Sequence, residues 1–171
     1  MSDLTRNEII KLIAIATKPL NLTGLDLRGI DLSNLDLTGA NLSNANLLEA
    51  MLCSVNLKDA FLTCANLYKA NLTNAYLSSA NLEKVCLRGA DLTGANLEKS
   101  NLENADLTEA ILKGANLESA ILKEADLEEA DLKGANLIGA NLIRANLLDA
   151  ILKGAILESA ILEEADSNWY Q

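Results

Sequence analysis

Leucine occupies every fifth position of the chain from Leu22 to Leu162, 29 times without an exception. An α-helix repeats every ~3.6 residues and a β-strand every ~2 residues, so neither element has this period. A short fixed period sustained over most of a chain is typical of a solenoid, in which successive turns of backbone stack on one another. The hydrophobic pattern therefore predicts the fold class before composition is considered.

The residues around each leucine define a five-residue unit. The position two before the leucine is Ala in nearly every unit from Ala40 onward, and the position one before it is mostly Asn or Asp. Ala, Asx, Leu alternates inward, outward, inward, as a short strand does. All nine glycines lie two positions after a central leucine, and four units have Asn there. Because Gly and Asn tolerate the positive φ of a type II turn, each unit predicts a strand of about three residues and a tight corner.

Four such units are expected to close one coil. Lys-Gly-Ala recurs at residues 113–115, 133–135 and 153–155, a spacing of 20 residues. A 20-residue period built from 5-residue units gives a coil with four sides. Stacked strands lie about 4.8 Å apart, so the about seven coils between residues 20 and 166 predict a rod roughly 35 Å long.

These units resemble the pentapeptide repeat family, as Ala-Asn-Leu-Ser-Asn at 40–44 and Ala-Asp-Leu-Thr-Gly at 90–94 illustrate. The resemblance implies an all-β solenoid, the right-handed quadrilateral β-helix of that family. It also implies two functional contexts: many members are cyanobacterial proteins of unknown function, and some antibacterial-resistance members bind DNA gyrase as DNA mimics.

The segment before the repeats predicts a helix over residues 4–17 that plugs the N-terminal end of the rod. Thr5 and Glu8 have the spacing of a capping box, and Pro19 ends the helix. The helix would turn its apolar residues toward a first coil whose inward positions are large: Leu4, Ile9, Leu12 and Ile13 against Leu20, Leu25, Ile30 and Leu35. The other interpretation is an amphipathic membrane anchor, which the few basic residues disfavour. The expected divisions are the capping helix (1–19), the β-helix (20–166) and a C-terminal tail (167–171).

Charge and cysteine usage narrow the class of protein. The net charge of −10 is uneven, because residues 1–82 carry 7 acids and 6 bases whereas residues 83–171 carry 17 acids and 8 bases. This acidity disfavours nucleic acid as a direct partner. No stretch has the roughly 18 apolar residues of a membrane span, and no secretory signal is evident, so we expect a cytoplasmic protein without a membrane partner. Three cysteines without a Cys-x-x-Cys motif are expected to be reduced thiols.

Residues typical of catalysis are scarce. The chain has no histidine, and its glycines follow the corner rule rather than a phosphate-binding motif. We therefore predict no enzymatic activity and no cofactor. Cys53, Cys64 and Cys86 are expected on different sides or corners of the rod. Glu109, Glu129 and Asp149 fall in one column of carboxylates, for which a solvated acidic surface is favoured over a calcium site.

Outward apolar residues mark the C-terminal end as a candidate interface. Isoleucine replaces Asx on three successive sides of the last coil, and apolar residues are expected to protrude from the three corners before it. The candidate set is Ile138, Ile143, Leu148, Ile151, Ile156, Ile161, Trp169 and Tyr170. These residues predict a weak homodimer through the C-terminal end. Alternatively, Trp169 and Tyr170 fold back over the end as a lid.

The leading functional hypothesis is a non-enzymatic scaffold that binds a protein whose identity the sequence does not specify. The alternative is a DNA mimic that binds DNA gyrase, and a second alternative is a regulatory protein of cyanobacterial differentiation or of photosynthetic cells. Duplex DNA carries one charge per about 1.7 Å, so a mimic ~35 Å long needs roughly 20 negative charges. The chain has a net charge of −10, and its central leucine is never replaced by the Phe expected from DNA-mimic members.

Overall fold

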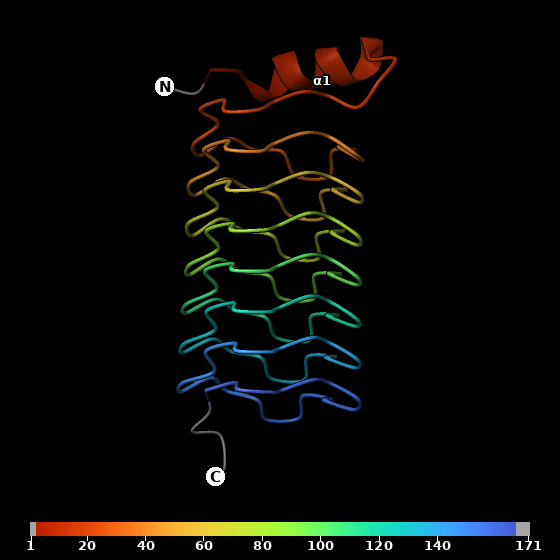
Figure 1. Ribbon diagram of the computed structural model, residues 1–171. Helices are drawn as coiled ribbons and strands as arrows, with labels where there is room; N and C mark the ends of the chain where they lie inside the picture. Colours follow the sequence, from red (N-terminus) through yellow and green to blue (C-terminus); the bar gives the residue numbers. More distant parts are fainter. Residues whose placement is uncertain (1–2, 167–171) are drawn as a thin grey trace.

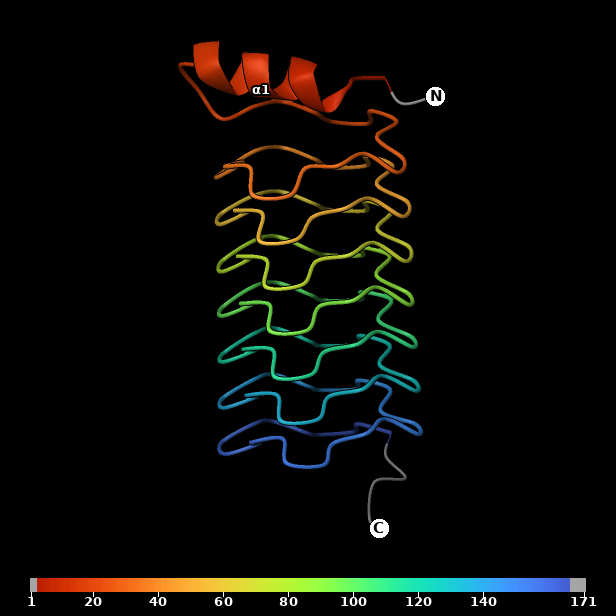
Figure 2. The same cartoon turned by 180° about the vertical axis from the view of Figure 1, so that it is seen from behind.

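The computed structural model of the protein describes residues 3–166. Figure 1 shows a straight stack of coils with helix α1 (Arg6–Ile15) lying across its N-terminal end, and Figure 2 shows the same stack from behind. Each fifth residue from Asn21 to Asn146 forms a parallel β-bridge with the residue 20 positions later. This register places four units in each coil. We number the sides by the central leucines of the first coil. Sides 1, 2, 3 and 4 contain Leu22, Leu27, Leu32 and Leu37, and the same numbers apply to later coils.

The sides of the coils are shorter than the three-residue strands expected from the sequence. Over the described range each side pairs with its neighbour through a single bridged residue, and no longer strand forms. The backbone N–H groups nevertheless donate hydrogen bonds, as the unit 95–99 illustrates. Its N–H groups donate in turn to Leu92 O, Ala75 O, Asn116 O, the Asn96 side chain and Glu118 O, at 2.7–3.1 Å. Since buried backbone polar groups must be paired, this repeated pattern holds the coils together.

The core is a column of leucine and alanine. From Ala40 to Leu147 each central leucine and each residue two before it is buried. Ser100 is the one buried polar residue of the described range, and its hydroxyl donates to Leu97 O at 2.7 Å. The inward–outward alternation predicted from the sequence is therefore confirmed.

The corners have the positive φ that was predicted, but this conformation is not restricted to Gly and Asn. Every position two after a central leucine has positive φ, from Gly24 to Glu164. Twenty of these residues are not glycine, among them Glu49, Lys69 and Arg144. Such a conformation costs an L-residue about 1–2 kcal/mol. The bond from each corner N–H to the next coil, as in Lys99 N to Glu118 O at 2.9 Å, helps to hold these residues in it.

Helix α1 is shorter than the expected span of 4–17. It begins after Thr5, whose side chain accepts from Glu8 N while the Glu8 carboxylate accepts from Thr5 N, so the predicted capping box is present. It ends at Ile15, before Pro19, with Ala16 extended. Ile9 is completely buried in the core, and Leu4 and Ile13 pack against it. Leu12 is half-buried and does not join this packing, so its expected role was wrong.

Among the described residues, no helix has both the length and the apolar character needed to cross a membrane.

Candidate functional site

The outward surface of the rod is built mainly from Asn and Asp side chains. Each Asn or Asp at the bridged position from Asn21 to Asn146 accepts a hydrogen bond from the N–H two residues later. Some also bond along the rod, as Asn136 Nδ2 does to Asn116 Oδ1 at 3.0 Å. These side chains are therefore structural, as short Asx side chains at turns commonly are.

Apolar residues interrupt this polar surface at scattered positions along the rod and at three successive positions in the last coil. Ile151, Ile156 and Ile161 are 41%, 49% and 43% exposed and lie on sides 3, 4 and 1. Elsewhere the large exposed residues of the coils are Met51, Phe61, Tyr76 and Ile121. The last coil thus concentrates exposed isoleucine around one end of the molecule.

The core is open at this end. The inward residues of the last coil are only partly buried, in contrast to the core above them: Ala150, Leu152, Ala155, Leu157, Ala160, Leu162 and Ala165. Each leucine N–H above them donates to the next coil, as Leu142 N does to Ile161 O at 2.8 Å. Within the described residues, the N–H groups of Leu152, Leu157 and Leu162 have no such acceptor. The end therefore presents apolar side chains together with backbone groups that have no partner among the described residues.

Ile138, Ile143 and Leu148, which the sequence predicts to protrude from three corners, are less exposed than the isoleucines of the last coil. All three are half-buried, and none is among the exposed large apolar residues. Each N–H donates to the Asn two residues before it, at 3.0–3.1 Å. Trp169 and Tyr170, the remaining members of the candidate set, lie outside the described residues.

The carboxylate column has the expected alignment, since Glu109, Glu129 and Asp149 follow one another at the register of 20 residues. Glu109 accepts a charge-assisted bond from Arg88 at 2.8 Å. Over residues 3–166, no group of three or more His, Cys, Asp or Glu side chains is arranged to hold a metal ion. Cys53, Cys64 and Cys86 are free thiols, of which Cys64 is exposed.

The N-terminal end differs, because residues before the first coil pair with its backbone. Asp3 N donates to Asp26 O at 2.6 Å, and the Asp3 carboxylate accepts from Asp26 N at 2.6 Å, on side 2. On side 3 the Arg6 guanidinium donates to Asp31 O at 2.8 Å and to Ser33 O at 2.9 Å. These contacts occupy backbone groups that a preceding coil would otherwise bond.

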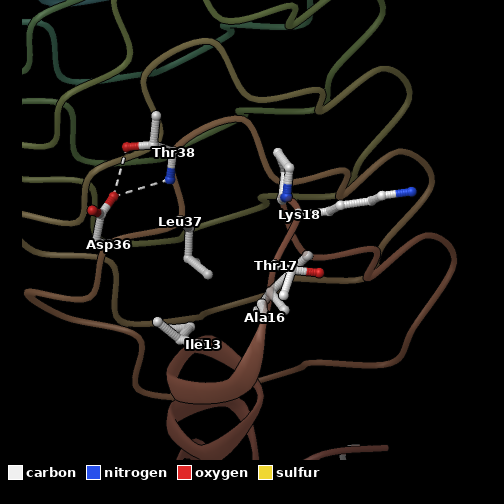
Figure 3. A pocket seen from close by; sticks show the side chains of 9 residues that line it. Ile13, Ala16, Thr17, Lys18, Asp36, Leu37 and Thr38 are labelled. Atoms are coloured by element: carbon white, nitrogen blue, oxygen red, sulfur yellow. Dashed lines mark hydrogen bonds between the residues drawn. The ribbon is translucent and has the colours of Figure 1, made fainter.

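Beside them, a cavity of about 320 Å³ lies between the chain after α1 and side 4 of the first coil (Figure 3). Its lining combines apolar and polar side chains: Ile13, Ala16, Thr17, Lys18, Pro19, Leu20, Asp36, Leu37 and Thr38. Asp36 Oδ1 accepts from Thr38 Oγ1 at 2.6 Å and from Thr38 N at 3.1 Å. Hydrogen bonds from the Thr38 hydroxyl and backbone lower the pKa of Asp36 below its ordinary value of 3.8.

Sequence reasoning did not predict this cavity. One signal was present, because three of the four outward Asx residues of the first coil are the aspartates Asp26, Asp31 and Asp36. The contacts that Asp3 and Arg6 make with these units depend on how the N-terminal segment lies across the first coil, which the sequence pattern does not specify.

Comparisons with known proteins agree with this architecture. The family model described as pentapeptide repeats matches in eight copies that together cover residues 21–166. No curated protein sequence matches the chain. Among solved structures, HetL, a pentapeptide repeat protein involved in heterocyst differentiation regulation from the cyanobacterium Nostoc sp. strain PCC 7120, is 30% identical. That match covers 95% of this chain and 96% of HetL, with a TM-score of 0.48.

A second similar structure is that of QnrB1, a plasmid-mediated fluoroquinolone resistance protein. It is 18% identical over 90% of this chain and 89% of QnrB1, with a TM-score of 0.62. At this identity the similarity supports the fold alone. A pentapeptide repeat protein of the Arabidopsis thaliana thylakoid lumen is 29% identical over 70% of this chain and 69% of that protein, with a TM-score of 0.43.

Proposed function

Because the chain belongs to the pentapeptide repeat family, we propose that it is a non-enzymatic scaffold that binds proteins, with its C-terminal end as a self-association surface. The observation that carries the proposal is the open last coil with its exposed isoleucines. In this proposal the rod is a right-handed β-helix of about seven coils over residues 20–166, with residues 1–19 closing the other end. The absence of histidine and the structural use of the outward Asx side chains support a binding role rather than catalysis.

The backbone of the last coil is suited to pairing with a second copy. Leu157 N–H and the Ala155 and Ala160 carbonyls, which in every coil above would bond the following coil, have no described partner. A two-fold axis would bring donors of one copy to acceptors of the other, and closed two-fold dimers are the commonest assembly. The same contact would bury Ile151, Ile156 and Ile161. The area of one square coil is small, so we expect a weak dimer.

Charge at this end opposes the contact. Glu158, Glu163 and Asp166 are exposed on the last coil, and a two-fold contact would bring these like charges of two copies toward one another. Salt screens such repulsion, with a Debye length of about 10 Å at 0.1 M. We therefore expect the dimer to strengthen as salt is added, unlike an association held by opposite charges.

The test is light scattering over a concentration series on the parent and on Ile156→Lys combined with Ile161→Lys. The parent should shift from monomer toward dimer with concentration, and the variant should remain monomeric because two lysines would be buried at the contact. Ile121→Lys is the matched control, since Ile121 lies in the same column as Ile161 with similar exposure but in the middle of the rod. A parent that is monomeric at every concentration and salt would overturn self-association.

A DNA gyrase supercoiling assay distinguishes the gyrase-binding alternative from the scaffold function. The net charge of −10 is about half of what a DNA-like rod of this length requires. We expect no inhibition of gyrase at concentrations that saturate self-association, and inhibition would favour the DNA-mimic function instead.

A further inference from the structure

The N-terminal edge of the first coil carries the same backbone groups on each of its four sides. In later coils, the carbonyl of the bridged residue and the carbonyl two residues on accept from the preceding coil, as Asn56 O does from Leu37 N and Lys58 O from Gly39 N. The first coil has no preceding coil, so its carbonyl pairs need other donors. The way each side meets this need differs.

Side 3 is completed by one arginine side chain. The two guanidinium nitrogens of Arg6 reach Asp31 O and Ser33 O at 2.8 and 2.9 Å, and Nη1 also lies 3.2 Å from the Asp31 carboxylate. The planar fork of the guanidinium thus replaces the two N–H donors of a missing coil. An ammonium group has no such fork, so lysine cannot reproduce this contact.

Side 4 has the equivalent groups without a donor. No described residue donates to Asp36 O or Thr38 O, and the Asp36 carboxylate holds the place that the Asp31 carboxylate holds beside Arg6. Both residues line the cavity, and Figure 3 shows Lys18 extending away from Asp36. On side 1, no described residue donates to Asn21 O or Thr23 O either, but the outward residue there is the uncharged Asn21.

The walls of the cavity suit an arginine stem. Ile13, Ala16 and Leu20 supply apolar side chains to the same lining as Asp36 and Thr38. Long cationic side chains pack their methylene groups on such surface while the charged group makes polar contacts. The volume of about 320 Å³ is far above the roughly 10–15 Å³ that one water molecule needs, so a side chain can enter.

We propose that this cavity binds an arginine side chain of a partner protein, with the guanidinium on the Asp36 and Thr38 carbonyls and against the Asp36 carboxylate. The proposal deepens the scaffold function, because it rests on that function and gives the chemistry of one partner. The site lies at the end opposite the self-association surface. Binding there can therefore be measured whether or not the protein dimerises.

The experiment is an NMR titration of the full chain with N-acetyl-L-arginine methylamide. We expect saturable shifts of the Asp36, Leu37 and Thr38 amide signals at millimolar probe concentrations. The lysine analogue carries the same charge without the fork, and the alanine analogue offers only peptide groups. We expect both to bind at least several-fold more weakly, because bidentate charge-assisted bonds are the stronger ones.

Asp36→Asn is the test variant. Asn occupies the same position in later coils of this side, so the turn is kept while the charge is lost. We expect about a tenfold weaker affinity for the arginine probe, since charge-assisted bonds are roughly twice as strong as neutral ones. Asp149→Asn makes the same change of charge at the far end and should bind as the parent does, and so should Ile161→Lys.

Three results would overturn the proposal: no saturable shift, equal binding of the lysine or alanine analogue, or equal effects of Asp36→Asn and Asp149→Asn. Failure of self-association alone would leave the titration unchanged. Failure of the titration would likewise leave the light-scattering result standing, so the two proposals fail separately.

Discussion

At the residue scale, each position of the five-residue unit has one physical task. The central leucine fills the core, the Asx residue bonds the corner, and the second corner residue adopts positive φ. Leu97 and Asn96 show the first two tasks side by side. Leu97 is completely buried, whereas Asn96 is outward and accepts from Glu98 N at 3.1 Å.

Replacing Leu97 with Asp should unfold the protein or its central coils. The change removes a buried side chain and places an unpaired charge in the leucine core, a combination that costs more than about 4 kcal/mol. Asn96→Asp adds the same charge one residue away on the outside and should melt near the parent temperature. Thermal unfolding followed by circular dichroism checks both, and equal melting of Leu97→Asp and the parent would mean that Leu97 is not inward.

Replacing Asn116 with Ala should destabilise the rod by roughly 1–2 kcal/mol, because several part-exposed hydrogen bonds are lost at once. Asn116 Oδ1 accepts from Glu118 N at 3.2 Å and from Asn136 Nδ2 at 3.0 Å, and its Nδ2 donates to Asn96 at 3.3 Å. Asn116→Asp keeps both acceptor bonds and should cost less. Urea unfolding measures the difference, and equal losses for the two variants would show that the acceptor bonds contribute little.

At the element scale, α1 and the coils depend on each other. A helix of ten residues is marginal in water alone, and α1 is held by Ile9 in the core and by the Arg6 contacts to side 3. In return, these residues cover apolar surface and backbone groups at the first coil. The N-terminal end of the rod therefore has a cap of the kind that solenoids generally need at an exposed edge.

Deleting residues 1–18 should make the protein self-associate through its N-terminal end. The deletion removes Ile9 from the core and exposes Leu20, Leu25, Ile30 and Leu35, together with the carbonyls that Arg6 occupies. We expect larger species in size-exclusion chromatography with light scattering, and a lower melting temperature. Ile15→Asp, at a 76% exposed position of the same helix, should change neither. A truncated rod as monodisperse and stable as the parent would contradict the capping role.

At the scale of the whole molecule, both charge and exposed apolar side chains are distributed unevenly along the rod. The aspartates of the first coil are held ionised. The pKa of Asp26 is lowered by the Arg28 side chain, and that of Asp31 is lowered by the backbone N–H of Ser33. The Thr38 hydroxyl does the same for Asp36. Aspartates with lowered pKa values stabilise the folded state only while they are ionised.

The free energy of unfolding should therefore fall in acid. A carboxyl whose folded pKa lies below its unfolded value contributes fully above the unfolded pKa and loses that contribution as the pH drops through the folded pKa. The ordinary value is 3.8, so the loss should begin near pH 4 and grow below it. Urea unfolding at several pH values checks this. Asp36→Asn should reduce the slope, and an unchanged slope would exclude Asp36 as a contributor.

The sequence alone determined the repeating part of this protein. The period of five placed every central leucine inside, and the period of 20 placed each bridged residue above its partner, as the pairing of Asn96 with Asn116 shows. It also located the capping box of the helix. These features were predictable because each coil contacts only its neighbours, so a local pattern specifies a local path that is then repeated.

Only the tertiary structure decided the details that depend on several coils or on the ends. Corner residues such as Glu49 adopt positive φ because the adjoining coil holds their N–H, not because of their own preference. Ile138, which the sequence predicts to protrude from its corner, is half-buried. The pairing of Arg6 with Asp31 and Ser33, and the open edge at Asp36, arise where the chain folds back over the first coil. No local period encodes that contact, because it joins residues about 25 positions apart that belong to different kinds of structure.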